Sequence, residues 1–123
     1  MAKPLCLIVD DSDVVRRVLK HILDKLRLDV SEAADGASAL NQCRLAMPDA
    51  VLLDWSMPGA TAIETLQSLR RLPGGHGPVV IYCPTEYDPD DVARARAAGA
   101  NDVLVKPFTR VELQKSLMAA GLL

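Results

Sequence analysis

Four side chains suited to phosphate chemistry follow three apolar segments of the chain. Asp10 and Asp11 come directly after one segment, Asp54 after a second, and Lys106 after a third. In an open parallel sheet, residues just past the strand ends line a common crevice. Carboxylates that crowd there raise one another's pKa unless a cation offsets their charge. Hard oxygen ligands suit Mg²⁺, so the pattern indicates a site for metal-assisted phosphate chemistry.

The elements that would position these residues alternate along the chain. Short β-like runs alternate with segments of helical periodicity, which predicts a parallel sheet built from βα units. The sequence predicts five helices and five strands, the strands being Leu5–Val9, Leu28–Ala33, Ala50–Leu53, Val79–Cys83 and Asp102–Val105.

The helices carry recognisable start signals and apolar faces. Ser12 or Asp13 can cap the first helix, and capping boxes at Thr61–Glu64 and Thr109–Glu112 start the third and the last. The first helix has a row of apolar residues at i,i+4 spacing, with a second apolar row beside it. The last helix is expected to have three apolar residues that face inward. These residues are Val14, Val18, Ile22 and Leu26, then Val15, Leu19 and Leu23, and in the last helix Val111, Leu113 and Leu117.

The helix that begins at Asp88–Pro89 has little to bury. Only Val92 and several alanines are available to pack against the sheet. Such thin packing predicts a unit of low local stability.

Composition limits the class of protein. The 123 residues are 50% apolar and 24% charged, with a net charge of −2, so we expect one globular domain over residues 1–123. The charge argues against a nucleic-acid or membrane partner. Because the sequence lacks a signal peptide and a run of ~18 apolar residues, we expect a cytoplasmic protein. Cys6, Cys43 and Cys83 lack metal-ligand spacing and are read as buried reduced thiols.

Three motifs in this order resemble the receiver domain of two-component response regulators. They are Asp10-Asp11, the loop that runs from Asp54 to Gly59, and Lys106-Pro107-Phe108. The resemblance covers the whole chain and is strongest to the stand-alone chemotaxis type. It implies a flavodoxin-like α/β fold, a doubly wound five-stranded parallel sheet in the order 2-1-3-4-5, which is the known order of the chemotaxis receiver.

The resemblance also implies a role for each motif residue. Asp54 would be the phosphoryl acceptor, and a carboxylate is chemically able to form an acyl phosphate. Asp10, Asp11, Asp54 and the backbone carbonyl of Ser56 would hold Mg²⁺. The plainer interpretation is that Asp54 is a solvated loop residue and that Asp10 and Asp11 cap the first helix.

The lysine motif completes the implied site. Lys106 would offset negative charge on the phosphoryl oxygens as a point cation. Family members hold the following peptide bond cis, and Pro107 is the candidate here, since X-Pro is the common setting for a cis bond. The plainer interpretation is an exposed lysine at a strand end.

Two positions depart from the family pattern. Receivers place Thr or Ser at the end of strand four, and this position is Pro84, followed by Thr85. Either a local bulge lets Thr85 supply the hydroxyl, which is the interpretation we favour, or that role is lost. The switch aromatic of strand five falls at Val103, and Tyr82 is either structural or a substitute for it. These changes leave phosphate acceptance in place and put the usual output switch in doubt.

The leading hypothesis is therefore a single-domain response regulator. It would take phosphate from a histidine kinase or a histidine phosphotransfer protein, which its first helix and the loop after strand five would dock. It would signal through the face of helix four, strand five and helix five, without enzymatic activity beyond its own phosphoryl transfer and loss. The main alternative is a phosphate-independent protein-binding module, which Pro84 and Val103 favour. An aspartate-nucleophile phosphatase is disfavoured because Ser56 stands where such enzymes carry a second Asp.

Overall fold

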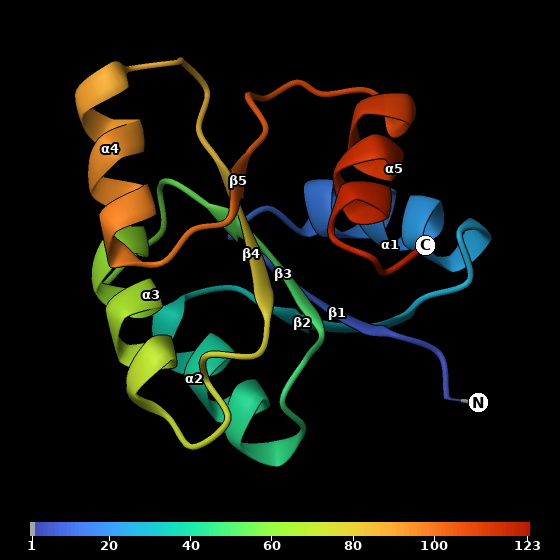
Figure 1. The fold of residues 1–123 in the computed structure, drawn as a ribbon, viewed down its shortest axis with the longest axis horizontal. Helices are drawn as coiled ribbons and strands as arrows, with labels where there is room; N and C mark the ends of the chain where they lie inside the picture. The colour runs from blue at the N-terminus through green and yellow to red at the C-terminus, as the bar shows by residue number, and fades with distance from the viewer. Residues whose placement is uncertain (1) are drawn as a thin grey trace.

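A parallel sheet with helices on both faces forms the protein (Figure 1). The computed structural model describes residues 2–123, and within them the strands pair in the order β2-β1-β3-β4-β5. This is the predicted doubly wound, flavodoxin-like arrangement, which is confirmed. The elements are β1 (Leu5–Val9), α1 (Asp13–Lys25), β2 (Asp29–Ala33), α2 (Gly36–Leu45), β3 (Ala50–Asp54), α3 (Ala62–Arg71), β4 (Val79–Cys83), α4 (Pro89–Ala98), β5 (Asp102–Val103) and α5 (Arg110–Ala119).

The sheet divides the core into two halves. Leu7 and Leu53 face α2, α3 and α4, whereas Ile8 and Leu52 face α1 and α5. All five residues of β3 are buried, as expected for a central strand with both faces covered. β1 and β3 are hydrogen-bonded neighbours with Val9 opposite Leu53, so the residues that follow them meet at one edge.

The helix starts agree with the sequence signals. Ser12, and not Asp13, caps α1, because its side chain accepts a hydrogen bond from the backbone of Val15. Both predicted capping boxes form, at the starts of α3 and α5. In α4 only Val92 and Ala95 are buried, in agreement with the thin packing expected there.

β5 is shorter than predicted, and Pro84 provides the physical reason. The backbone N–H of Leu104 donates to Tyr82 and that of Lys106 donates to Pro84, so the chain still runs alongside β4. The reciprocal bond would need an N–H at position 84, which proline lacks. Regular pairing therefore ends at Val103, although the sequence predicted a strand as far as Val105.

One prediction of an inward-facing residue is wrong. Val111 is 57% exposed, because the inward face of α5 is set by Leu113 and Leu117, and a residue two positions before Leu113 lies on the far side. Val14 and Val18 are also exposed. The inward stripe of α1 is centred on buried leucines one position further along, which leaves these valines on an outer apolar surface.

The interpretation of the three cysteines as buried reduced thiols is borne out. All three cysteines are free and buried. Among the helices of residues 2–123, none combines the length and the apolar character that crossing a membrane requires.

Candidate functional site

Three carboxylates meet where β1 and β3 end. Asp10 and Asp11 follow β1, and Asp54 is the last residue of β3. Each offers a carboxylate oxygen within 4.8 Å of the other two. Asp10 and Asp54 are buried at 3% and 5% exposure, whereas Asp11 is exposed. The structure thus brings together the acidic residues that the sequence singled out.

Lys106 reaches this cluster from the loop after β5. Its Nζ lies 2.6 Å from Oδ2 of Asp10 and 2.7 Å from Oδ1 of Asp54. Its backbone N–H donates to the carbonyl of Pro84, and the peptide bond to Pro107 is cis. The ammonium therefore bridges two carboxylates that would otherwise repel each other.

The cluster holds more acidic groups than basic groups. Burial raises the pKa of the Asp54 carboxyl above its usual value; Lys106 opposes this rise, and Asp10 and Asp11 add to it. Burial also acts to lower the pKa of Lys106, but its hydrogen bonds with Asp10 and Asp54 outweigh that effect and raise it. Three carboxylates face one ammonium at this edge, so the site retains negative charge.

The donor set fits a divalent cation. All three candidate ligands are carboxylate oxygens, the hard donors that Mg²⁺ prefers, and exposed Asp11 leaves one side of the cluster open to water. Ser56 lies in the exposed loop two residues beyond Asp54. Its part in the site stays a prediction.

The backbone and the side chain of Asp10 are both held by hydrogen bonds. Its N–H donates to the carbonyl of Ala33 at 3.0 Å, and its Oδ1 accepts from the backbone of Ser12 at 2.9 Å. Its carbonyl accepts a hydrogen bond from Arg16, a residue that the sequence reasoning did not assign to the site. The contact depends on a side chain that folds back from α1, which the presence of a basic residue at position 16 does not predict.

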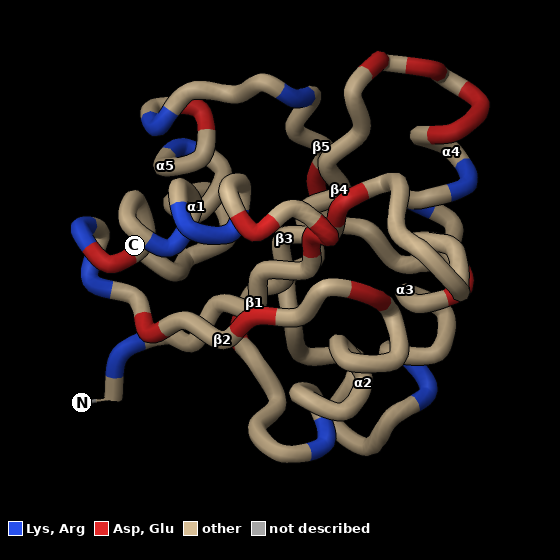
Figure 2. Tube along the Cα trace, turned by 180° about the vertical axis from the view of Figure 1, so that it is seen from behind, with Lys and Arg blue, Asp and Glu red and all other residues tan. Residues whose placement is uncertain are grey.

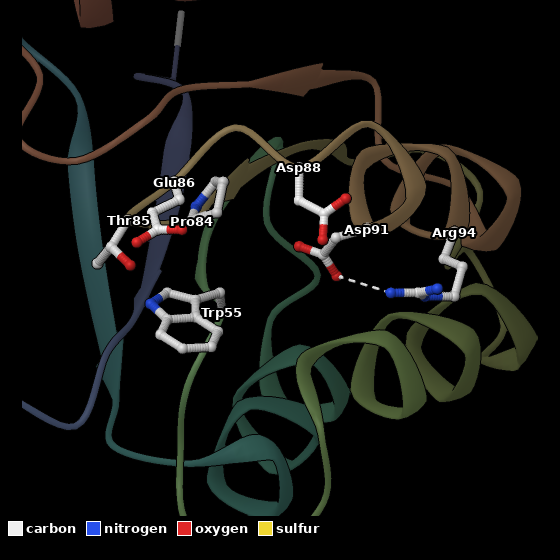
Figure 3. Close-up of a pocket in the computed structure, with 7 residues that line it drawn as sticks. All are labelled: Trp55, Pro84, Thr85, Glu86, Asp88, Asp91 and Arg94. Carbon is white, nitrogen blue, oxygen red and sulfur yellow. Dashed lines mark ion pairs between the residues drawn. The ribbon is translucent and has the colours of Figure 1, made fainter.

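Thr85 lies beside the site without being joined to it. Pro84 is buried at the end of β4, and Thr85 is the first exposed residue beyond it. Figure 3 shows Thr85 next to the indole of Trp55, at one end of a pocket of about 350 Å³ that extends toward Asp91 and Arg94. Within the described residues, the Thr85 hydroxyl makes no hydrogen bond to Asp54 or Lys106.

A tyrosine on β4 contacts α4. Tyr82 is 2% exposed, pairs with Val103 in the sheet, and donates its hydroxyl to Oδ2 of Asp91 at 2.8 Å. Burial and the neighbouring Asp91 carboxylate both raise the pKa of Tyr82, so it keeps its proton. This bond could not be predicted from the sequence, because Asp91 has the ordinary appearance of an acidic residue in the first turn of a helix.

Two contrasting surfaces flank the cluster. The start of α4 and the loop before it are strongly acidic (Figure 2). On the other side, the exposed valines of α1 line an apolar groove of about 440 Å³ that reaches Lys106. Its walls are formed by Val14, Val15, Val18, Leu19, Ile22, Thr85, Pro107 and Phe108.

Comparison with known proteins matches the chain to one family. Residues 6–118 match the response regulator receiver domain family. A chemotaxis protein CheY of Pseudomonas aeruginosa is 37% identical over an alignment of 115 residues, and the match covers 90% of each chain.

Solved structures of related proteins have a similar fold. The chemotaxis protein CheY4 of Vibrio cholerae superposes with a TM-score of 0.92 at 32% identity, covering 97% of this chain and 99% of that one. The receiver domain of a sensor histidine kinase from Pseudomonas aeruginosa has a TM-score of 0.88 at 30% identity, covering 98% and 99%. That structure contains a magnesium ion coordinated in its active-site cleft.

Proposed function

Since the chain belongs to the response regulator receiver domain family, we propose that it accepts a phosphoryl group on Asp54 in a Mg²⁺-dependent reaction. We further propose that residues 1–123 act as one receiver domain, which signals through changed contacts with other proteins. The observation that carries the proposal is the meeting of Asp10, Asp11, Asp54 and Lys106 at the carboxyl ends of β1 and β3.

Asp54 would act as the nucleophile. One of its carboxylate oxygens would form a bond to the phosphorus of a phospho-histidine, and the phosphorus–nitrogen bond would break with its electron pair passing to the imidazole. Phosphoryl transfer has a loose transition state, so positioning and charge neutralisation supply most of the catalysis. No enzymatic activity is proposed beyond this transfer and the later hydrolysis of the acyl phosphate.

The acidic residues would hold the metal that family members bind. Asp10, Asp11, Asp54 and the backbone carbonyl of Ser56 are the proposed ligands. A bound Mg²⁺ neutralises charge on the phosphoryl oxygens. Asp10 and Asp54 are already fixed by Lys106, which leaves the exposed Asp11 as the most accessible ligand.

Lys106 would transfer its contacts as phosphate arrives. Its ammonium now binds one oxygen of Asp54, and a phosphoryl group on that residue would present new oxygens within its reach. Thr85 is proposed as a partial substitute for the strand-four hydroxyl. The proposal is supported by its place in the groove that also contains Lys106.

Two protein surfaces are proposed for partners. The phosphoryl donor, a histidine kinase or a histidine phosphotransfer protein, would dock on α1 and the loop after β5, where the apolar groove reaches Lys106. A downstream protein would bind the face formed by α4, β5 and α5. A phosphoryl group changes this output only if its contacts differ between two states of that face.

A phosphate-independent binding module is the second candidate. Pro84 and Val103 favour it, because they replace the hydroxyl and the aromatic residue through which phosphate would change the output face. The intact acidic cluster and Lys106 favour the receiver. The two candidates differ in whether Asp54 is ever modified.

Site mapping tests the proposal. After incubation with acetyl phosphate and Mg²⁺, borohydride reduces an acyl phosphate to an alcohol, which converts the modified aspartate to homoserine. Peptide mass mapping is expected to find homoserine at position 54. Homoserine at Asp10 or Asp11, with Asp54 unchanged, would contradict the assignment.

A further inference from the structure

Arg16 contacts three different elements around the acidic turn. It lies in the second turn of α1, and its side chain is only 14% exposed. Its Nη1 donates to the carbonyl of Asp10 at 2.5 Å, its Nη2 pairs with Asp13, and its Nε lies 3.3 Å from Oε1 of Glu32 on β2. One guanidinium therefore links the end of β1, the start of α1 and the second strand.

This linkage matters most for Asp11. Asp10 is fixed independently through its own carboxylate, which contacts Ser12 and Lys106. The exposed Asp11 carboxylate has no hydrogen bond within the described residues, so its backbone is what sets the direction in which the side chain projects. Because Arg16 binds the carbonyl of the peptide unit that joins Asp10 to Asp11, it restrains that backbone directly.

We propose that Arg16 is a positioning residue for the metal site, one that orients Asp11 through the carbonyl of Asp10. The inference rests on the proposed function, since it assumes that Asp11 is a Mg²⁺ ligand. Guanidinium suits this role because its rigid fork of donors can satisfy several acceptors at once, which an ammonium cannot do in the same geometry.

Charge and geometry make opposite predictions, which allows a decisive test. A positive charge beside the acidic cluster repels Mg²⁺, so removing it would by electrostatics alone strengthen binding. Loss of positioning would weaken binding, and outer contacts of this kind typically contribute about tenfold or more to metal affinity. Arg17 offers a matched control, because it is the neighbouring arginine on the same helix and is exposed.

The experiment is a Mg²⁺ titration at constant ionic strength, followed by the fluorescence of Trp55, the only tryptophan and the residue next to Asp54. Arg16→Met is expected to weaken Mg²⁺ binding by about tenfold. Arg16→Lys, which keeps the charge, is expected to give an intermediate loss. Arg17→Met is expected to bind Mg²⁺ as tightly as the wild type or slightly more tightly.

The unfolding free energy without Mg²⁺ is measured for each variant to separate positioning from general stability. If Arg16→Met loses stability but binds Mg²⁺ unchanged, or binds it more tightly, the inference is overturned. If Arg16→Met does not fold, unchanged affinity in Arg16→Lys overturns it equally. Two other results would instead refute the proposed metal site itself. One is a wild-type fluorescence that does not respond to Mg²⁺, and the other is an Asp11→Asn variant that responds to Mg²⁺ as the wild type does.

Discussion

The ammonium of Lys106 lies 2.7 Å from a carboxylate oxygen of Asp54, although 52 residues separate the two in sequence. The same ammonium also contacts Asp10, so one cation holds together the ends of β1 and β3. This relationship makes the acidic cluster compatible with a folded chain before any metal binds.

Removing the Lys106 charge is expected to destabilise the metal-free protein. Lys106→Met should lower the free energy of unfolding by about 2 kcal/mol, less than the loss of a fully buried pair because the lysine is partly exposed. Urea unfolding with and without Mg²⁺ measures this effect, and Mg²⁺ should restore part of the loss. Lys115→Met, at an exposed lysine on α5, is the control and should change little. Equal stability of the two variants would contradict the account.

The Tyr82–Asp91 hydrogen bond is expected to hold α4 against the sheet. Tyr82→Phe should lower the unfolding free energy by about 1 kcal/mol and speed hydrogen exchange in α4 more than in α1, since α4 buries little else. Tyr87→Phe provides a matched control, because Tyr87 is 63% exposed. Unchanged exchange in α4 of Tyr82→Phe would show that the helix is held by other contacts.

Thr85 is expected to contribute to the phosphorylated state and not to folding. Thr85→Ala should leave the unfolding free energy within about 0.5 kcal/mol of the wild type, because the residue is exposed. It should reduce the fluorescence change of Trp55 that acetyl phosphate produces. The same phosphoryl-dependent change in both proteins would mean that the hydroxyl role is absent from this chain.

Two buried thiols predict a loss of stability at alkaline pH. Burial raises the pKa of Cys6 and of Cys83 from 9.0 to about 12. Their protonated forms therefore add stability that is fully present below pH 9.0 and is lost as the pH rises toward 12. Each thiol can contribute up to about 1.4 kcal/mol per pH unit in this window.

Urea unfolding of the reduced protein across that range measures the slope of stability against pH. Cys83→Ala removes one of the two thiols and should give a shallower slope than the wild type. Parallel slopes would show that other groups, such as the lysines, dominate the alkaline transition.

The bounds of β1 and β4 and the meeting of the four site residues could be predicted from the sequence, because apolar runs define strands and strand ends define the crevice. The end of β5 could not, since it depends on a missing N–H in a different strand. The contact of Arg16 with Glu32 likewise depends on how β2 packs beside β1. Val111 was wrongly predicted to face inward, because it is as apolar as Leu113 although the two residues lie on opposite sides of the helix.

The most direct test of the central claim is the intact mass after incubation with acetyl phosphate, for the wild type and for Asp54→Ala, with and without Mg²⁺. If Asp54 accepts phosphate in a Mg²⁺-dependent reaction, the wild type gains one phosphoryl group with Mg²⁺, and there is no gain when either the metal or the Asp54 carboxylate is removed. No gain in the wild type, under conditions that label a control receiver, would contradict the account and favour the phosphate-independent binding module.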